Sequence, residues 1–341
     1  MTSPRIAVLG AGANGASIGA DLTAAGHDVV LIEQWPEHVE RMRSHGLRIL
    51  SPEGELTVHP RTMHLCEVAT LRNKFDIVLM LMKAYDSRWA AQLIAPHLAD
   101  DGLLAGLQNG MTVDAIASAV GISRTMGTVI EVSSTMDEPG LVHRHTGVAQ
   151  SWFAVGAPDG GPSGREEDVA SLLRHSGTVQ LADNIIATKW MKLISNSTLL
   201  VTSAALGLPM LDALHQPGMR EIMLAAGEEA LAVGRAIGHP ILPIFGLTPE
   251  EVADPDRVVE IMLDKLFAGF VVPGATTTVL QDWRKSRRSE AEDLNGHVEA
   301  EGARLGVPTP MNSAVVEIAR RIERGELEPD PANLALMADA L

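Results

Sequence analysis

The sequence predicts an α/β domain in residues 1–183 followed by an all-α domain in residues 184–341. In the first part, short apolar runs alternate with helical segments, and some runs are apolar almost throughout, as in parallel strands covered on both faces. From about Asn184 onward, nearly every segment repeats its apolar residues with helical spacing. A chain of 341 residues also exceeds the usual size of one hydrophobic core, so two domains are expected.

Composition indicates a globular protein that acts on a small molecule. Hydrophobic residues make up 46% of the chain and charged residues 21%, which is enough apolar material for a core. The net charge is −16 and no long Lys/Arg run occurs, so a surface for nucleic acid or anionic membrane is not expected. We expect a small-molecule substrate, no nucleic-acid or membrane partner, and a homodimer as one candidate assembly.

Cysteine usage and the N-terminus point to a cytoplasmic protein. The single cysteine, Cys66, excludes an internal disulfide, and no Cys/His cluster has metal-ligand spacing, so no metal site is expected. The N-terminus lacks the regions of a signal peptide, and no apolar run approaches the length of a membrane span. A reducing cytoplasm is therefore the expected location.

The first predicted strand, residues 6–9, runs into a glycine-rich turn with the sequence G-A-G-A-N-G at residues 10–15. In a dinucleotide-binding unit the first glycine makes the tight turn, the second lets the backbone approach a pyrophosphate, and the third packs the helix on its strand. The N–H groups at the start of that helix favour phosphate. The turn therefore predicts a Rossmann-type domain, with Gly10, Gly12, Ala13, Asn14 and Gly15 at the cofactor.

The context of the turn supports a bound dinucleotide over a purely structural role. The helix after Gly15 continues to Gly26, a candidate C′ residue, and a second strand, residues 29–32, ends at Glu33. An acid at that place accepts hydrogen bonds from ribose hydroxyls and repels a 2′-phosphate, so NAD(H) is favoured. Arg41 and Arg43 lie near enough in sequence to keep NADP(H) as the alternative.

Two further strands place polar residues at their carboxyl ends, where ligands bind in such sheets. Lys83 follows an apolar run at residues 75–82, and Asn109 follows a predicted strand at 102–107. A solvated lysine and a simple Asn-Gly turn are the alternatives for these two residues.

The other segments of the first domain are predicted as a helix at 37–44, a hairpin of 47–50 with 56–58, and a helix at 86–98. Alternating segments at 127–182, with a loop at 159–164 and a helix at 166–174, are expected to complete the sheet.

The first helix of the C-terminal domain carries polar residues on one face. Spacings of three and seven place Lys189, Lys192 and Asn196 together, although a lysine stripe alone is usually a solvated face.

Further along the C-terminal domain, long helices are predicted at 219–238 and 276–305. Between them, residues 239–247 have too many prolines for a helix and too many apolar groups for a free loop. This segment either covers a pocket or packs on its own domain.

Taken in order, the motifs resemble the ketopantoate reductase family, whose members reduce a 2-oxo acid with a nicotinamide cofactor. The resemblance covers almost the whole chain, and the joint order of the motifs is far more specific than any one of them. They are G-A-G-A-N-G at 10–15, Lys83, Q-N-G at 108–110, K-W-M-K-L-I-S-N at 189–196, T-T-V-L-Q-D at 277–282 and S-E-A-E-D-L-N-G at 289–296.

The resemblance implies a role for each of the matched residues. Lys192 is the implied general acid, which donates a proton to the substrate carbonyl oxygen as hydride reaches its carbon. Glu290 is expected near Lys192 and the cofactor, and Asn196 and Thr278 are expected to hold the substrate. The remaining matches line the cofactor cleft: Lys83, Asn109, which also reaches the substrate, and Ser133, which lies near the nicotinamide.

Two departures from the family pattern concern the substrate. Ketopantoate-specific members carry a second asparagine one turn along the catalytic helix and another after the following proline, where this chain has Leu200 and Met210. On a continuous helix Leu200 shares the face of Lys192, which predicts a more apolar substrate pocket; a kink near 195–197 would instead leave Leu200 in the core. A genuine 2-dehydropantoate 2-reductase is the alternative, and a non-catalytic dinucleotide sensor is the alternative of another class.

Overall fold

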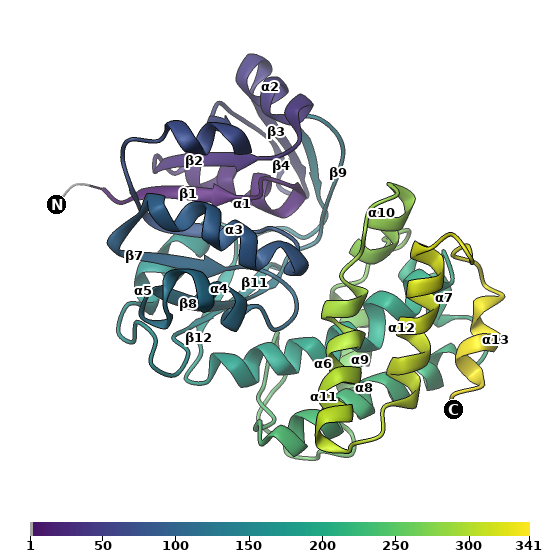
Figure 1. The fold of residues 1–341 in the computed structure, drawn as a ribbon. Coiled ribbons are helices and arrows are strands. Elements are labelled where there is room, and N and C mark those ends of the chain that lie inside the picture. Colours follow the sequence, from purple (N-terminus) through teal and green to yellow (C-terminus); the bar gives the residue numbers. More distant parts are fainter. Residues whose placement is uncertain (1–2) are drawn as a thin grey trace. The chain divides into compact units, whose positions relative to one another are not determined.

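The structure, a computed structural model, describes residues 3–341, and the chain divides into two compact units. Unit 1 holds the described residues up to Gln108 together with Thr112–Ile186, and unit 2 holds Asn109–Met111 together with Ala187–Leu341 (Figure 1). Unit 1 is mixed α/β with a largely parallel sheet and unit 2 is helical, which confirms the predicted fold class. None of the helices in residues 3–341 has both the length and the apolar composition that crossing a membrane requires.

The main sheet of unit 1 has eight strands, of which the six from β8 to β5 in spatial order run parallel. β11 joins β8 in antiparallel register, and β12 runs parallel to β11. In spatial order the strands are β12 (Thr178–Leu181), β11 (Trp152–Gly156), β8 (Thr125–Glu131), β7 (Leu98–Gly106), β6 (Phe75–Met80), β1 (Arg5–Leu9), β2 (Asp28–Glu33) and β5 (Arg61–His64).

Helices cover both faces of this sheet, because its central strands are apolar on both sides. One core joins α1 and α5 to side chains such as Ile6 and Val8, and the other joins α3 and α4 to Ala7 and Leu9. The helices of unit 1 are α1 (Ala13–Ala24), α2 (Pro36–His45), α3 (Ser87–Ile94), α4 (Val113–Val120) and α5 (Glu166–Leu173). Gly26 follows α1 with φ +84°, as a C′ glycine does.

A second, four-stranded sheet corrects the expectation that residues 127–182 only complete the main sheet. Its order is β4 (Gly54–Val58), β3 (Leu47–Ser51), β10 (Leu141–Arg144) and β9 (Ser134–Glu138). The predicted hairpin is present as β3 and β4, but β9 and β10 pair with it rather than with β8. These strands bury only some of their side chains, including Ile49 and Val142 in the α1 core, so they suit a sheet with one solvated face.

Unit 2 consists of helices, and one of the predicted ones is wrong in extent. Its helices are α6 (Ile185–Ala205, which begins in unit 1), α7 (Met210–Leu214), α8 (Met219–Ile237), α9 (Val258–Gly269), α10 (Thr278–Arg284), α11 (Asn295–Leu305), α12 (Pro310–Glu323) and α13 (Asn333–Ala338). Residues 276–305 were expected as one helix, yet α10 and α11 are separate. Between them Ser286 has φ +52° and Leu294 has non-helical angles, and only the short 3-10 helix η5 (Ala291–Asp293) forms.

Candidate active site

The glycine-rich turn after β1 has a backbone that only glycine fits at two of its positions. Gly10 has φ +92°, and a Cβ there would lie 2.9 Å from the backbone of Leu81 and Met82. A Cβ on Gly15 would overlap the carbonyl oxygen of Gly10, so the helix packs directly on the turn. These two glycines are therefore required by the fold of unit 1 itself.

Gly12 differs from its two neighbours because a Cβ there would have no described atom within 4 Å. Gly12 is also the N-cap of α1, and no side chain caps the N–H groups of the first turn in residues 3–341. The Asn14 Oδ1 atom, in that turn, is buried and has no hydrogen-bond partner among the described residues. Open space at Gly12 and free N–H donors at the start of α1 fit the pyrophosphate of a dinucleotide, which the backbone of Gly12, Ala13 and Asn14 would hold.

His38 of α2 is hydrogen-bonded to the glycine-rich turn, a role that no sequence signal indicated. The amide of Gly140 donates to its Nδ1 at 2.8 Å, so Nε2 carries the proton and donates to the carbonyl of Ala11 at 3.0 Å. Burial lowers the pKa of His38 to about 4, although the bond to Ala11 acts in the opposite direction. A neutral histidine thus joins the turn to the second sheet.

The carboxylate of Glu33 lies at the end of β2, where sequence reasoning expected it. Glu33 is buried, and its Oε1 accepts a hydrogen bond from the amide of Trp35 at 2.9 Å. Arg43, the candidate partner of a 2′-phosphate, donates instead to the carbonyl of Thr62 at 3.1 Å and pairs with Glu67 and Glu40. The Arg43 guanidinium is therefore already engaged in a hydrogen bond and two ion pairs with neighbouring residues.

Lys83 and Ser133 each follow a strand of the main sheet. Lys83 is the N-cap of a short 3-10 helix after β6, and Gln108 holds this loop by donating to the carbonyl of Met82 at 3.0 Å and to Ser87 Oγ at 2.8 Å. Gln108 thereby ties the ends of β6 and β7 together, a role missed at the level of sequence although it belongs to the quoted Q-N-G motif. The Ser133 amide, after β8, donates to Thr146 Oγ1 at 3.0 Å.

In unit 2, α6 is one continuous helix of 21 residues, and its polar stripe is not a solvated face. Lys189, Lys192 and Asn196 are only 3%, 8% and 2% exposed. Burial lowers the pKa of Lys189 to about 8. Since no break separates Lys192 from Leu200, which is half-buried, the two lie on the same helix face.

The loop at 109–111 meets α6 and the segment before α11. Asn196 Nδ2 donates to Asn109 Oδ1 at 3.0 Å, which joins two candidate substrate-binding amides. A Cβ on Gly110 would lie 2.9 Å from the carbonyl oxygen of Asp293. Burial, and then the negative charge of Glu290, raise the pKa of Asp293 to about 6.

Glu290 lies in the interruption between α10 and α11, and it is 5% exposed. Its carbonyl accepts from the amides of Asp293 and Leu294, which closes the turn on itself. Thr278, the first residue of α10, has a buried Oγ1 without a hydrogen-bond partner in residues 3–341. An orphaned hydroxyl suits the predicted contact with substrate; that role, like the predicted proximity of Glu290 to Lys192, stays a prediction.

A buried amide network, missed at the level of sequence, anchors α6 to the helices around it. Asn295 Nδ2 donates to the carbonyl of Ser197 at 3.0 Å and to Asn312 Oδ1 at 2.9 Å. Asn312 in turn donates to Glu229 Oε2 at 2.7 Å. The asparagine of the S-E-A-E-D-L-N-G motif therefore positions the helix that carries Lys192.

The apolar segment at 239–247 lies beside Lys192. The Lys192 Nζ atom is 5.3 Å from the centroid of the Phe245 ring, and that ring meets Phe270 edge to face at 5.8 Å. Phe245 is 4% exposed and has φ +32°, a strained backbone conformation for a bulky residue. An aromatic wall thus stands next to the candidate general acid.

Comparisons with known proteins match both units. The family models described as "Ketopantoate reductase PanE/ApbA" and its C-terminal counterpart match residues 6–160 and 184–323. A 2-dehydropantoate 2-reductase of Archaeoglobus fulgidus is 24% identical over 95% of this chain and 100% of its own length. One from Caulobacter vibrioides is 29% identical over 93% of this chain and 98% of its own length.

Solved structures give the same picture. A PanE/ApbA family ketopantoate reductase from Ralstonia eutropha is 27% identical, with a TM-score of 0.80 over 94% of this chain and 99% of that one. The ternary structure of a D-mandelate dehydrogenase with NADH and anilino(oxo)acetate has a TM-score of 0.82 over 94% of this chain and 99% of that one. At 21% identity the second likeness is one of fold.

Proposed function

Because the chain belongs to the ketopantoate reductase family and is an NAD(P)-dependent oxidoreductase acting on CH–OH groups, we propose that it interconverts a 2-oxo acid or ketone bearing an apolar group with the corresponding alcohol. The observation that carries the proposal is the buried Lys192, whose ammonium stands beside the Phe245 ring on a continuous α6. A binding protein without turnover needs no such proton donor.

In this reaction Lys192 holds and moves the proton. When bound, the reduced nicotinamide supplies the hydride that reaches the carbonyl carbon. Negative charge then develops on the carbonyl oxygen, and the Lys192 ammonium stabilises it and donates the proton; in the other direction Lys192 accepts it. Asn196 lies one helical turn beyond Lys192 on α6 and donates to Asn109 Oδ1, so this pair offers amide groups for orienting the substrate.

The cofactor would be held by unit 1, where the turn at 10–15 receives the pyrophosphate and Glu33 receives a ribose diol. We propose NAD(H) over NADP(H), because the Glu33 carboxylate is fixed at the end of β2 and Arg43 is paired with acids. Comparing kcat/KM for NADH and NADPH tests this choice. Equal or better use of NADPH would overturn it.

We infer that the apolar substrate group is received by Phe245, which lies beside Lys192, and by Leu200, which shares a face of α6 with Lys192. Neither side chain can hydrogen-bond a substrate hydroxyl, and one buried methylene changes discrimination roughly 10-fold to 200-fold. The fold accepts such a compound in D-mandelate dehydrogenase, whose structure holds anilino(oxo)acetate. The competing proposal is a genuine 2-dehydropantoate 2-reductase, which the names of the curated relatives favour.

A panel of 2-oxo acids and ketones, ranked by kcat/KM while cofactor oxidation is followed, separates these proposals. The wild type should prefer 2-oxo acids whose side group is an aromatic ring or a hydrocarbon without a hydroxyl over ketopantoate. Leu200→Asn should shift the ranking toward ketopantoate. If the wild type already prefers ketopantoate, the specificity argument is wrong. Tight cofactor binding with no turnover on any compound would instead favour the dinucleotide sensor.

The proposed location is the cytoplasm. Cys66 is an exposed free thiol, which suits a reducing compartment. Fractionation of cells that express the full chain tests this directly. Recovery of the protein from an oxidising compartment would contradict it.

A further inference from the structure

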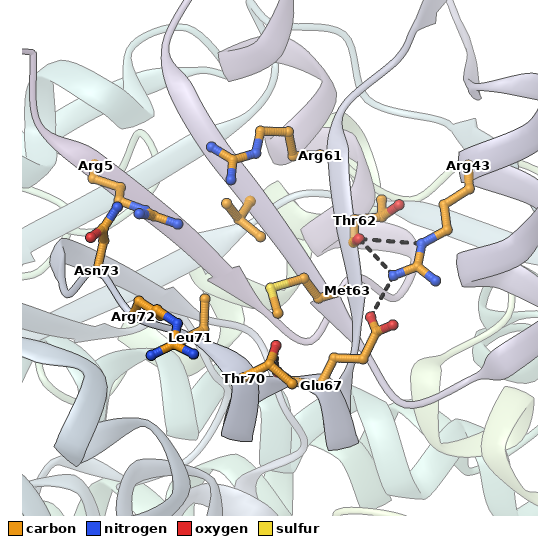
Figure 2. Close-up of a pocket in the computed structure, with 11 residues that line it drawn as sticks. Arg5, Arg43, Arg61, Thr62, Met63, Glu67, Thr70, Leu71, Arg72 and Asn73 are labelled. Carbon is orange, nitrogen blue, oxygen red and sulfur yellow. Dashed lines mark hydrogen bonds and ion pairs between the residues drawn. The ribbon is translucent and has the colours of Figure 1, made fainter.

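Unit 1 contains a cavity of about 530 Å³, whose lining does not include the glycine-rich turn. Figure 2 shows its lining, which comes from β1, β2, α2, β5 and the connection from β5 to β6. That connection contains only a short 3-10 helix, Leu65–Thr70, in place of the longer helix that usually joins parallel strands. The sheet edge is therefore left partly uncovered, and a space the size of a small-molecule site remains.

Four arginines line this cavity, against one acidic residue, Glu67. Glu67 pairs with Arg43. Figure 2 shows Arg43 on the right of the view, Arg61 at the top, and Arg5 and Arg72 on the left. In a chain with net charge −16, this is a local concentration of positive charge.

The other three arginines, Arg5, Arg61 and Arg72, are only partly engaged by neighbouring groups. Arg61 meets Asp28 at 3.2 Å in an exposed pair, and Asp76 accepts from the backbone amide of Arg5 at 2.7 Å rather than from its side chain. The Arg5 guanidinium lies 5.1 Å from the Phe75 ring, and its buried Nε has no hydrogen-bond partner in residues 3–341. Arg72 is exposed and forms no ion pair within the same residues.

A second orphaned polar atom, the buried Thr62 Oγ1, belongs to the same lining. Buried polar groups are normally hydrogen-bonded, and these two unsatisfied groups belong to residues on two strands that line the same cavity. Guanidinium groups match phosphate oxygens in two-pronged geometry, and a phosphoryl group offers three acceptor oxygens. Val30, Met63 and Leu71 add apolar surface for a carbon portion.

From this arrangement we propose that the cavity binds a small phosphate-bearing molecule at a site separate from the dinucleotide. Val30, in the lining, precedes Glu33 by three residues, which is roughly 10 Å along an extended strand. The lining residues Arg5 and Arg61 lie at the starts of β1 and β5, whereas the turn for the dinucleotide lies at the carboxyl ends. The proposal does not depend on the reaction assigned to unit 2.

Calorimetric titration of the full chain with pyrophosphate, against sodium chloride at equal ionic strength, tests the site. When the dinucleotide site is first saturated with NADH, we expect saturable binding of one further pyrophosphate. Arg72→Gln and the double variant Arg61→Gln/Arg72→Gln should weaken it roughly 10-fold to 100-fold, since charge-assisted hydrogen bonds are lost. Arg88→Gln, on an exposed arginine of α3 outside the lining, changes the net charge equally and should have no effect.

Several results would overturn the proposal. These are an absence of saturable binding when the dinucleotide site is saturated with NADH, or equal weakening by Arg88→Gln, which would indicate non-specific charge attraction. Titration with citrate tests whether the cavity prefers carboxylates. Tighter binding of citrate than of pyrophosphate would contradict a phosphate site. The melting temperature of each variant shows whether it is folded. If the double variant is unstable, Arg72→Gln alone still tests the site, because it changes an exposed side chain.

Discussion

Two segments that carry candidate site residues hold their backbones by different means. The turn at 10–15 in unit 1 is fixed by its own glycines, since Gly10 has positive φ and Gly15 leaves no room for a Cβ. The interruption between α10 and α11 in unit 2 contains a strained serine, Ser286, and is held from another helix. There Glu323 Oε1 accepts from the amide and hydroxyl of Ser289 at 2.9 and 2.7 Å and from Trp283 Nε1 at 3.2 Å.

The difference explains why one segment is visible in the sequence and the other is not. Glycine spacing is a local signal, and it predicts the strand, turn and helix directly. The interruption depends on a carboxylate that lies 34 residues from Ser289 along the chain. Local helical periodicity continues across residues 276–305, so it predicted one helix where tertiary contacts form two.

Among the variants that test this comparison, Gly15→Ala should lower the stability of the protein most. Its Cβ would meet the backbone of Gly10, which cannot move away as a flexible side chain can, so we expect a loss of roughly 3 kcal/mol in the free energy of unfolding. Cofactor affinity should fall with it. Chemical denaturation and cofactor titration measure the two effects.

Gly12→Ala is the matched variant for the same turn. Its Cβ enters open space, so stability should change by less than about 0.5 kcal/mol, while dinucleotide binding should weaken strongly because the pyrophosphate is excluded. Undiminished cofactor binding by Gly12→Ala would show that the open space at Gly12 is not the phosphate cradle.

His38 allows a further test of the comparison, because it is a distant side chain that is hydrogen-bonded to the turn. Its pKa is about 4 in the folded chain and near 6.5 when unfolded, so the unfolded chain binds more protons between these values. Stability contributed by His38 is therefore complete above pH 6.5 and lost as pH falls toward 4, by roughly 2 to 3 kcal/mol. His38→Gln can keep both hydrogen bonds without titrating, so its stability should fall less on acidification; parallel losses in the two proteins would rule this account out.

Glu323→Ala tests the interruption in unit 2. Removing the acceptor shared by Ser289 and Trp283 should cost roughly 1 to 2 kcal/mol and should lower turnover, since Glu290 follows Ser289 directly. Glu323→Gln retains an acceptor oxygen and should lose less. Glu317→Ala is the control on the same helix, because its exposed pair with Arg324 contributes little. Equal effects of Glu317→Ala and Glu323→Ala would mean that the contact does not hold the segment.

Sequence reasoning was most successful where a signal is local. It predicted β1, α1, β2 and the helix that carries Lys192, because glycines, apolar runs and helical spacing are read within a few residues. It left open whether that helix continues past residues 195–197. It missed His38, Gln108 and Asn295 as positioning residues, since their partners Ala11, Met82 and Ser197 lie far away in the chain. The position of Phe245 beside Lys192 likewise depends on packing between segments that no local pattern connects.

The central claim is that Lys192 is the general acid of an oxidoreductase, and turnover by Lys192→Ala tests it most directly. We predict that kcat falls on the order of 10²-fold to 10⁴-fold while cofactor affinity is unchanged. Lys74→Ala, which removes an exposed lysine paired with Asp100, should keep full activity. A Lys192→Ala protein that retains most of its kcat on the best substrate would contradict the account.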